Sequence, residues 1–175
     1  MIEQVVLVDE AGRSLGAMAK SEVHSAATPL HLAFSCYVFN DEGLLLLSRR
    51  ALSKATWPGV WTNSFCGHPQ PGESTSEAVH RRAAHELGAR VREVSVVVPE
   101  FQYRAVDASG IVENEICPVY TATLDSALAP NPEELVQWEW VNPAQVSFAA
   151  EVAPFAFSPW MVEQLPLLRF GTEDG

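Results

Sequence analysis

One well-marked helix constrains how this chain can fold. Ser74 and Glu77 have the spacing of a capping box, in which each residue satisfies a backbone N–H of the first turn. Apolar residues then recur at intervals of four and form a single stripe, made of Val79, Ala83 and Leu87. Gly88 follows at the position where a left-handed residue ends many helices. The pattern predicts an amphipathic helix that begins after Ser74 and ends at Gly88.

The rest of the chain consists mostly of short runs of apolar and β-branched residues separated by turn residues, which is typical of strands. Turns are predicted between Gly12 and Gly16, over 40–43 and over 107–110, and a second helix is predicted to begin at Ser158–Pro159 and to end or kink at Pro166. The predicted strands are 5–8, 31–39, 44–47, 61–66, 94–98, 102–106, 111–123 and 135–141. A sheet with few helices predicts a mixed α+β fold, and 175 residues without a linker predict a single domain.

Composition narrows the class of protein. Eleven Lys and Arg against 22 Asp and Glu give a net charge of -11, which disfavours nonspecific binding to nucleic acid or to an anionic membrane. No apolar run reaches the roughly 18 residues of a transmembrane helix, and the acidic start of the chain does not resemble a signal peptide. Three cysteines are too few for a disulfide framework, so we expect a reduced, cytoplasmic protein.

The predicted helix also carries polar residues suited to a phosphate site. A glycine-bearing loop from Gly67 leads through Glu73 to the helix, where Arg82 and Glu86 lie four residues apart and therefore on one face. A guanidinium beside a carboxylate could hold a phosphate together with its Mg²⁺. The alternative is an ordinary surface ion pair.

A second set combines imidazoles with carboxylates. His24, His31 and His68 lie in loops or at strand edges, and Glu113 and Glu115 are two residues apart on one predicted strand, so both point to the same face. A cation between them would offset the cost of burying two carboxylates, and such ligands suit Mn²⁺, Zn²⁺ or Fe²⁺ better than Ca²⁺. The alternative is a solvated edge strand that carries both glutamates.

Other candidates are less specific. Cys66 precedes a loop and could exchange a proton, or it could be a buried structural thiol, as we expect for Cys36 and Cys117. The aromatic residues are more often packing groups, although a tryptophan face can stabilise a cation. Basic residues either form an anion pocket or are a scattered solvated set: Lys20, Arg49, Arg50, Lys54 and Arg82.

Taken together, these residues resemble the type 1 isopentenyl diphosphate isomerases of the Nudix superfamily. The resemblance runs from about Val5 to Leu168, and its most specific stretches are HLAFSCYVFN, RRALSKATWPGVWTNSFCGHP, YRAVDASGIVENEICPVY and FAFSPWM. It implies that residues 1–175 form one Nudix-like domain, a mixed β-sheet sandwiched by helices. The Nudix hydrolase pattern has glutamates where this chain has Arg82 and His85. The isomerases share that departure, which disfavours diphosphate hydrolysis.

The resemblance assigns a role to each matching position. It implies catalytic roles for Cys66, Glu115, Tyr103 and Trp160, with Cys66 and Glu115 as the acid–base pair. It implies that the substrate diphosphate is bound by Lys20, Arg50, Lys54 and Arg82, together with Mg²⁺ on Glu86. It implies that one further divalent ion, Mn²⁺, Mg²⁺ or Zn²⁺, is bound by His24, His31, His68, Glu113 and Glu115.

The implied activity is the interconversion of isopentenyl and dimethylallyl diphosphate in isoprenoid biosynthesis. Two other hypotheses remain open at this level, a Nudix-type diphosphohydrolase and a noncatalytic metal- or diphosphate-binding module. The implied partner is a small diphosphate substrate, and the acidic surface favours a monomer.

Overall fold

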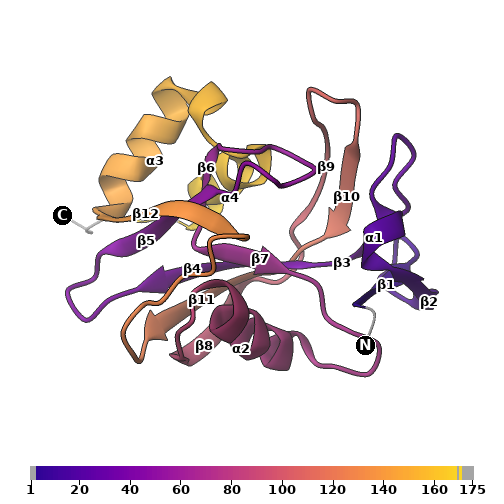
Figure 1. The fold of residues 1–175 in the computed structure, drawn as a ribbon, viewed down its shortest axis with the longest axis horizontal. Helices are drawn as coiled ribbons and strands as arrows, with labels where there is room; N and C mark the ends of the chain where they lie inside the picture. The colour runs from indigo at the N-terminus through magenta and orange to yellow at the C-terminus, as the bar shows by residue number, and fades with distance from the viewer. Residues whose placement is uncertain (1–2, 169, 171–175) are drawn as a thin grey trace.

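The chain forms two mixed β-sheets with helices packed around them (Figure 1). The computed structural model describes residues 3–168 and 170. One sheet has the strand order β2-β1-β3-β10-β9, and its strands are β1 (Gln4–Val8), β2 (Ser14–Ala19), β3 (His31–Leu32), β9 (Gln102–Val106) and β10 (Val112–Ile116). The other has the order β12-β5-β4-β11-β8, and its strands are β4 (Phe34–Phe39), β5 (Leu45–Arg50), β8 (Val91–Val98), β11 (Val119–Leu124) and β12 (Leu135–Val141). Two short strands join it, β6 (Trp61–Thr62) beside β5 and β7 (Phe65–Gly67) beside β4.

The helix predicted after Ser74 is confirmed as α2 (Thr75–Glu86). The Ser74 side chain accepts from the N–H of Glu77, and the Glu77 carboxylate accepts from the N–H of Ser74, so both halves of the capping box are present. Gly88 has a φ of +57°, and a Cβ there would lie 2.1 Å from the carbonyl oxygen of Ala129. Glycine is therefore required where α2 ends, both for its backbone conformation and for space.

Helices cover both faces of the sheet that contains β4 (Figure 1). Side chains alternate along this strand: Phe34, Cys36 and Val38 pack with the apolar stripe of α2. Tyr37 faces the opposite way, into a second cluster with residues of α3 (Pro143–Val152) and α4 (Pro159–Leu168). The predicted α+β class, a sheet sandwiched by helices, is confirmed.

Two predicted strands are each divided between the two sheets. The run 31–39 breaks at Ala33 into β3 and β4, and the run 111–123 breaks at Cys117–Pro118 into β10 and β11. The two breaks lie side by side, because β3 pairs with β10 and β4 with β11, both in parallel. The N–H of Ser35 donates to the carbonyl of Pro118 across this junction. The run 31–39 is mostly apolar and buried on both sides of its break, which conceals the break, whereas Pro118 marks the break in 111–123.

Smaller differences concern single residues and short helices. Gly16 lies inside β2 rather than at the end of the preceding turn, and α4 continues through Pro166 to Leu168, so this proline does not end the helix. The helices α1 (Lys20–Val23) and α3 and the 3₁₀ turn η1 (Pro154–Ala156) were not predicted. Asn142 caps α3 and a proline follows at the first helical position, which is a local signal that the strand pattern before it obscured. The helices of the described residues are all too short or too polar to cross a bilayer.

Candidate functional site

One cavity of about 490 Å³ gathers the predicted site residues. All of them line it except His31, which is fully buried against the others. The cavity lies beside the junction of the two sheets: β10 supplies Glu113 and Glu115, and β7 supplies Cys66. Predicted residues as far apart in the chain as Lys20 and Trp160 therefore line the same cavity.

Three histidines and a glutamate form a compact cluster beside this cavity. One ligand atom from each of His24, His31, His68 and Glu115 lies within 4.8 Å of all the others. The pairing of β3 with β10 places His31 directly opposite Glu115. Glu113 lies at the side of this group, where its Oε2 is 3.1 Å from Nε2 of His24. Both glutamates are buried and β10 is an inner strand, so the alternative of a solvated edge strand is wrong.

The donor atoms of this cluster fit a divalent metal ion. Nδ1 of His31 lies 2.9 Å from the carbonyl of Pro29, which can only accept, so this nitrogen carries the proton and Nε2 presents a lone pair. Within residues 3–168 and 170, Nε2 of His24, Nε2 of His31 and Nδ1 of His68 are buried without a hydrogen-bond partner. Buried unpaired nitrogens are costly, and coordination of a cation would satisfy them.

Burial and ion pairing together set the charge of the cluster. Burial alone would raise the pKa of Glu115, but the adjacent imidazoles of His31 and His68 hold it well below its usual value. Burial lowers the pKa of His68, so this imidazole favours its neutral form. Burial alone would also lower the pKa of His31, but the neighbouring Glu115 carboxylate raises it. Metal binding requires an ionised carboxylate and neutral imidazoles, so a metal ion would compete with the proton that Glu115 favours on His31.

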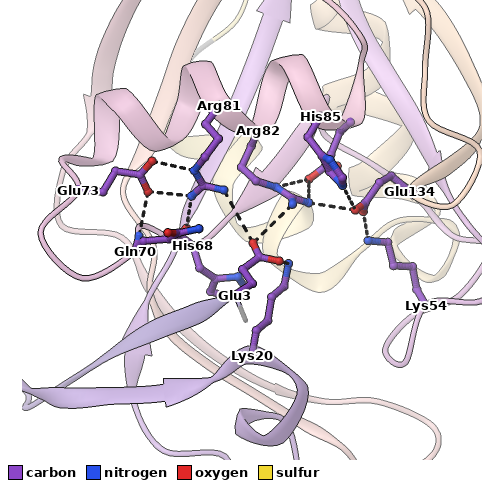
Figure 2. Close-up of polar contacts among 11 residues, drawn as sticks. Glu3, Lys20, Lys54, His68, Gln70, Glu73, Arg81, Arg82, His85 and Glu134 are labelled. Atoms are coloured by element: carbon purple, nitrogen blue, oxygen red, sulfur yellow. Dashed lines mark hydrogen bonds and ion pairs between the residues drawn. The ribbon is translucent and has the colours of Figure 1, made fainter. Parts of the chain in front are cut away.

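Four cationic side chains also line this cavity, and three of them already have carboxylate partners. Figure 2 shows Arg82 projecting from α2 between Glu3 and Glu134, with Lys20 and Lys54 beyond these carboxylates. The ammonium of Lys20 lies 3.1 Å from Oε2 of Glu3, and the ammonium of Lys54 pairs with Glu134. Nη2 of Arg82 lies 3.2 Å from Oε1 of Glu134.

Glu86 is the third carboxylate on Arg82, with an Nη2–Oε1 distance of 2.6 Å. Arg82 and Glu86 are 4% and 8% exposed, so the alternative of an ordinary surface ion pair is wrong. Four of the five basic residues singled out line the cavity, which also excludes a scattered solvated set. The exception is Arg49, whose Nε donates to the carbonyl of Gly59. The fourth cation of the wall, Arg50, donates to the carbonyls of Thr56 and Trp57.

The remaining predicted side chains surround Glu115 and the thiol. The hydroxyl of Tyr103 donates to Oε2 of Glu115 at 2.9 Å. Burial raises the pKa of the Cys66 thiol to about 12, so the sulfur holds its proton at neutral pH. The guanidinium carbon of Arg50 lies 5.3 Å from the ring centroid of Trp160, a cation–π contact. Cys36 and Cys117 are buried free thiols, as predicted.

The predicted loop-to-helix segment that begins at Gly67 is held together by Arg81, which donates to Glu73 and to the carbonyl of His68.

Other residues that support the site were not identified in the sequence. The hydroxyl of Thr56 donates to Oε1 of Glu113 at 2.7 Å. Glu3 and Glu134 pair with the cations described above. Their partners are remote in the chain, so no local spacing could have identified them. For Thr56 the only signal was its place in a loop rich in unusual residues.

Comparison with known proteins agrees with this arrangement. A model of the NUDIX domain family matches residues 29–163. An isopentenyl-diphosphate Delta-isomerase of Agromyces mediolanus is 60% identical over 168 residues, which cover 96% of this chain and 82% of that protein. The isopentenyl-diphosphate Delta-isomerase of Corynebacterium diphtheriae is 58% identical over 168 residues, which cover 94% of this chain and 92% of that protein.

Solved structures support the fold independently. A crystal structure of a protein from Deinococcus radiodurans superposes with a TM-score of 0.74 at 20% identity and covers 95% of this chain and 99% of that one. A MutT protein from Methanosarcina mazei gives a TM-score of 0.61 at 17% identity, covering 80% and 93%. The chain carries a NUDIX domain and belongs to the isopentenyl-diphosphate Delta-isomerase family.

Proposed function

We propose that this chain interconverts isopentenyl diphosphate and dimethylallyl diphosphate by moving a carbon–carbon double bond. The observation that carries the proposal is that the Cys66 thiol and the Glu115 carboxylate line the same cavity as four cationic side chains. An unactivated alkene must accept a proton at one end and lose a proton from a neighbouring carbon. This chemistry needs two proton-transfer groups on one bound substrate, with a diphosphate anchor at its other end.

The cations supply that anchor. Lys20, Arg50, Lys54 and Arg82 would bind the diphosphate, because guanidinium and ammonium donors match its oxygens. Glu86 lies beside Arg82 and would hold a Mg²⁺ ion that is shared with the diphosphate. Binding energy from this end, which does not react, would position the alkene between the two proton-transfer groups.

The reacting end would be enclosed by aromatic side chains. Protonation of the alkene gives a transition state that resembles a tertiary carbocation. Trp160 would stabilise this positive charge through its ring face without acting as a nucleophile. Tyr103 would hold the Glu115 carboxylate in place through its hydroxyl. The aromatic wall would also exclude water, which would otherwise capture the cation.

The His/Glu cluster would hold the second metal ion. His24, His31, His68, Glu113 and Glu115 are the proposed ligands, and Mn²⁺, Mg²⁺ or Zn²⁺ the proposed ions. The chemistry supplied by a divalent ion here is positive charge, which offsets the burial of two carboxylates and sets the acidity of Glu115.

Incubation with isopentenyl diphosphate in D₂O, followed by NMR, tests the proposal. Dimethylallyl diphosphate that carries deuterium is the expected product. Release of phosphate without isomerisation would instead indicate a hydrolase. Cys66→Ala is expected to abolish nearly all turnover, whereas a noncatalytic binding module would not depend on this thiol. Chelation is expected to stop the reaction, and full activity in metal-free protein would contradict both metal sites.

Other expectations from the sequence stay predictions. These are the single-domain organisation of residues 1–175, the monomeric state, the absence of nucleic-acid and membrane partners, and the cellular location. The roles of individual site residues are tested by the variants described below.

A further inference from the structure

We infer that Asn63 is a positioning residue that aligns the Cys66 thiol with the indole of Trp160, an inference that rests on the proposed function. Asn63 is fully buried and lies between β6 and β7, outside the set of residues assigned to substrate or metal. Its amide oxygen contacts one of the two proposed proton-transfer groups, Cys66, and the tryptophan proposed to face the developing positive charge, Trp160. The indole Nε1–H of Trp160 donates to this oxygen at 2.9 Å, and the sulfur of Cys66 lies 3.4 Å from it.

The surroundings of Asn63 permit only one orientation of its amide group. Its Nδ2 donates to the backbone carbonyls of Cys36 at 3.0 Å and Phe65 at 2.8 Å. Carbonyls can only accept, so a flipped amide would place its oxygen against two other oxygens. Oδ1 must therefore face Cys66 and Trp160, where it acts as a fixed acceptor.

Oδ1 of Asn63 also connects the start of α4 to the segment between β6 and β7 through two hydroxyl groups. The hydroxyl of Thr62 donates to Oδ1 of Asn63 at 2.9 Å and lies 2.7 Å from the hydroxyl of Ser158, directly before α4. The N–H of Ser158 donates to the carbonyl of Trp61. The segment from Ser158 to Trp160 is therefore held against β6 and Asn63 by the backbone of Ser158 and by the indole of Trp160.

A second polar group completes the environment of the sulfur. Ser35 Oγ lies 3.4 Å from Cys66 Sγ and accepts from Nε2 of Gln164 at 2.9 Å, while Oε1 of Gln164 accepts from the hydroxyl of Tyr37 at 2.9 Å. The Ser35 hydroxyl accepts from Gln164 and still has one hydrogen to donate. The sulfurs within reach of this hydrogen are those of Cys66 and Cys117. Asn63 and Ser35 therefore hold the Cys66 sulfur between two polar groups, each 3.4 Å away.

Asn63→Leu tests the inference, because leucine has a similar size but cannot accept a hydrogen bond. We expect kcat to fall at least about tenfold, since two oriented contacts at the reacting end are lost. We expect KM to stay within about twofold of the wild-type value, since the hydrogen bonds of Asn63 go to its neighbours in the fold and to Cys66 and Trp160 rather than to the cations proposed to bind the diphosphate. Ser48→Ala is the matched control, because it removes another buried hydrogen bond, to the carbonyl of Ser64, outside the proposed machinery. Equal kcat values in the two variants would overturn the inference.

A measurement on the wild-type protein covers the case in which Asn63→Leu does not fold. The indole N–H resonance of Trp160, assigned by its loss in Trp160→Phe, is expected downfield and slow to exchange with solvent. Free exchange of this proton in the wild-type protein would overturn the inference. If the wild-type protein did not isomerise the substrate, the proposed function would fail, while the indole resonance would still test the alignment.

Discussion

The hydroxyl of Tyr103 offers a test of the site by removal of a single oxygen atom. It donates to Oε2 of Glu115 at 2.9 Å, in surroundings where the tyrosine is 7% and the glutamate 5% exposed. In Tyr103→Phe the ring is retained, stacked on Phe101 with a centroid distance of 5.9 Å, and so is its contact with Trp160. The substitution therefore removes the hydrogen bond and leaves the packing.

The magnitude follows from the type of hydrogen bond that is lost. A hydrogen bond to a charged group contributes about 1.5–3 kcal/mol, and burial places this bond within that range. If the transition state depends on the orientation of Glu115, kcat should fall by about tenfold to 150-fold, at about 1.4 kcal/mol per tenfold. KM should change little, because Tyr103 is not among the cations proposed to bind the diphosphate.

Steady-state kinetics on metal-loaded protein, with the metal content measured in each variant, would check this expectation. Tyr120→Phe is the matched control, since Tyr120 packs against Phe34 in the cluster around α2 and does not line the cavity. This control should keep the kcat of the wild-type protein. A Tyr103→Phe enzyme with unchanged kcat, or an equal loss in Tyr120→Phe, would refute the reasoning.

Three further substitutions test other contacts. Thr56→Val removes the hydroxyl that orients Glu113, and we expect Mn²⁺ affinity, measured by calorimetry, to weaken about 10–100-fold; an unchanged Kd would contradict this. Gly67→Ala would place a Cβ 2.6 Å from Cγ of Arg82. We expect a loss of about 1–3 kcal/mol, at about 2–4 °C of Tm per kcal/mol, and a wild-type Tm in thermal unfolding would exclude the clash. Burial alone would raise the pKa of Glu134, but its cationic partners lower it to about 2. The ionised Glu134 carboxylate therefore contributes its full stabilisation of the folded protein at pH values above the unfolded-state pKa of the group, and this contribution is lost as the pH falls towards 2. The difference in unfolding free energy between the wild-type protein and Glu134→Gln, from urea titrations, should accordingly narrow between pH 5 and 3, and a constant difference would count against the ion pairs.

Local signals predicted the fold best where they were complete. The capping box at Ser74 and the glycine at position 88 predicted α2 with both of its ends, because all of these contacts lie within a few residues. The division of 31–39 and 111–123 between two sheets could not be predicted in this way. The run 31–39 is mostly apolar and buried on both sides of its break, so its hydrophobic pattern does not change there. In 111–123 Pro118 marks the break, but a proline does not indicate which sheet the chain joins next.

The residues of the site could likewise be predicted only in part. The resemblance to a known family supplied the residues that line the cavity, whereas the spacing of Glu113 and Glu115 predicted only that they share a face. The supporting side chains could not be identified from the sequence because their hydrogen-bond partners lie far away along the chain. Thr56 reaches Glu113 over 57 positions, and Asn63 reaches Trp160 over 97. Such contacts exist only once the two sheets have come together.

The pairing of Lys20, Lys54 and Arg82 with carboxylates has a consequence for ligand selection. An anion that bound these cations would have to exchange places with carboxylates that are covalently part of the chain, so its binding would compete with those ion pairs. We expect a small anion such as sulfate to displace only one or two of these carboxylates at a time. A ligand with several linked oxygens would displace them together, so the number of contacts that a ligand makes at once would matter more for selection than its charge.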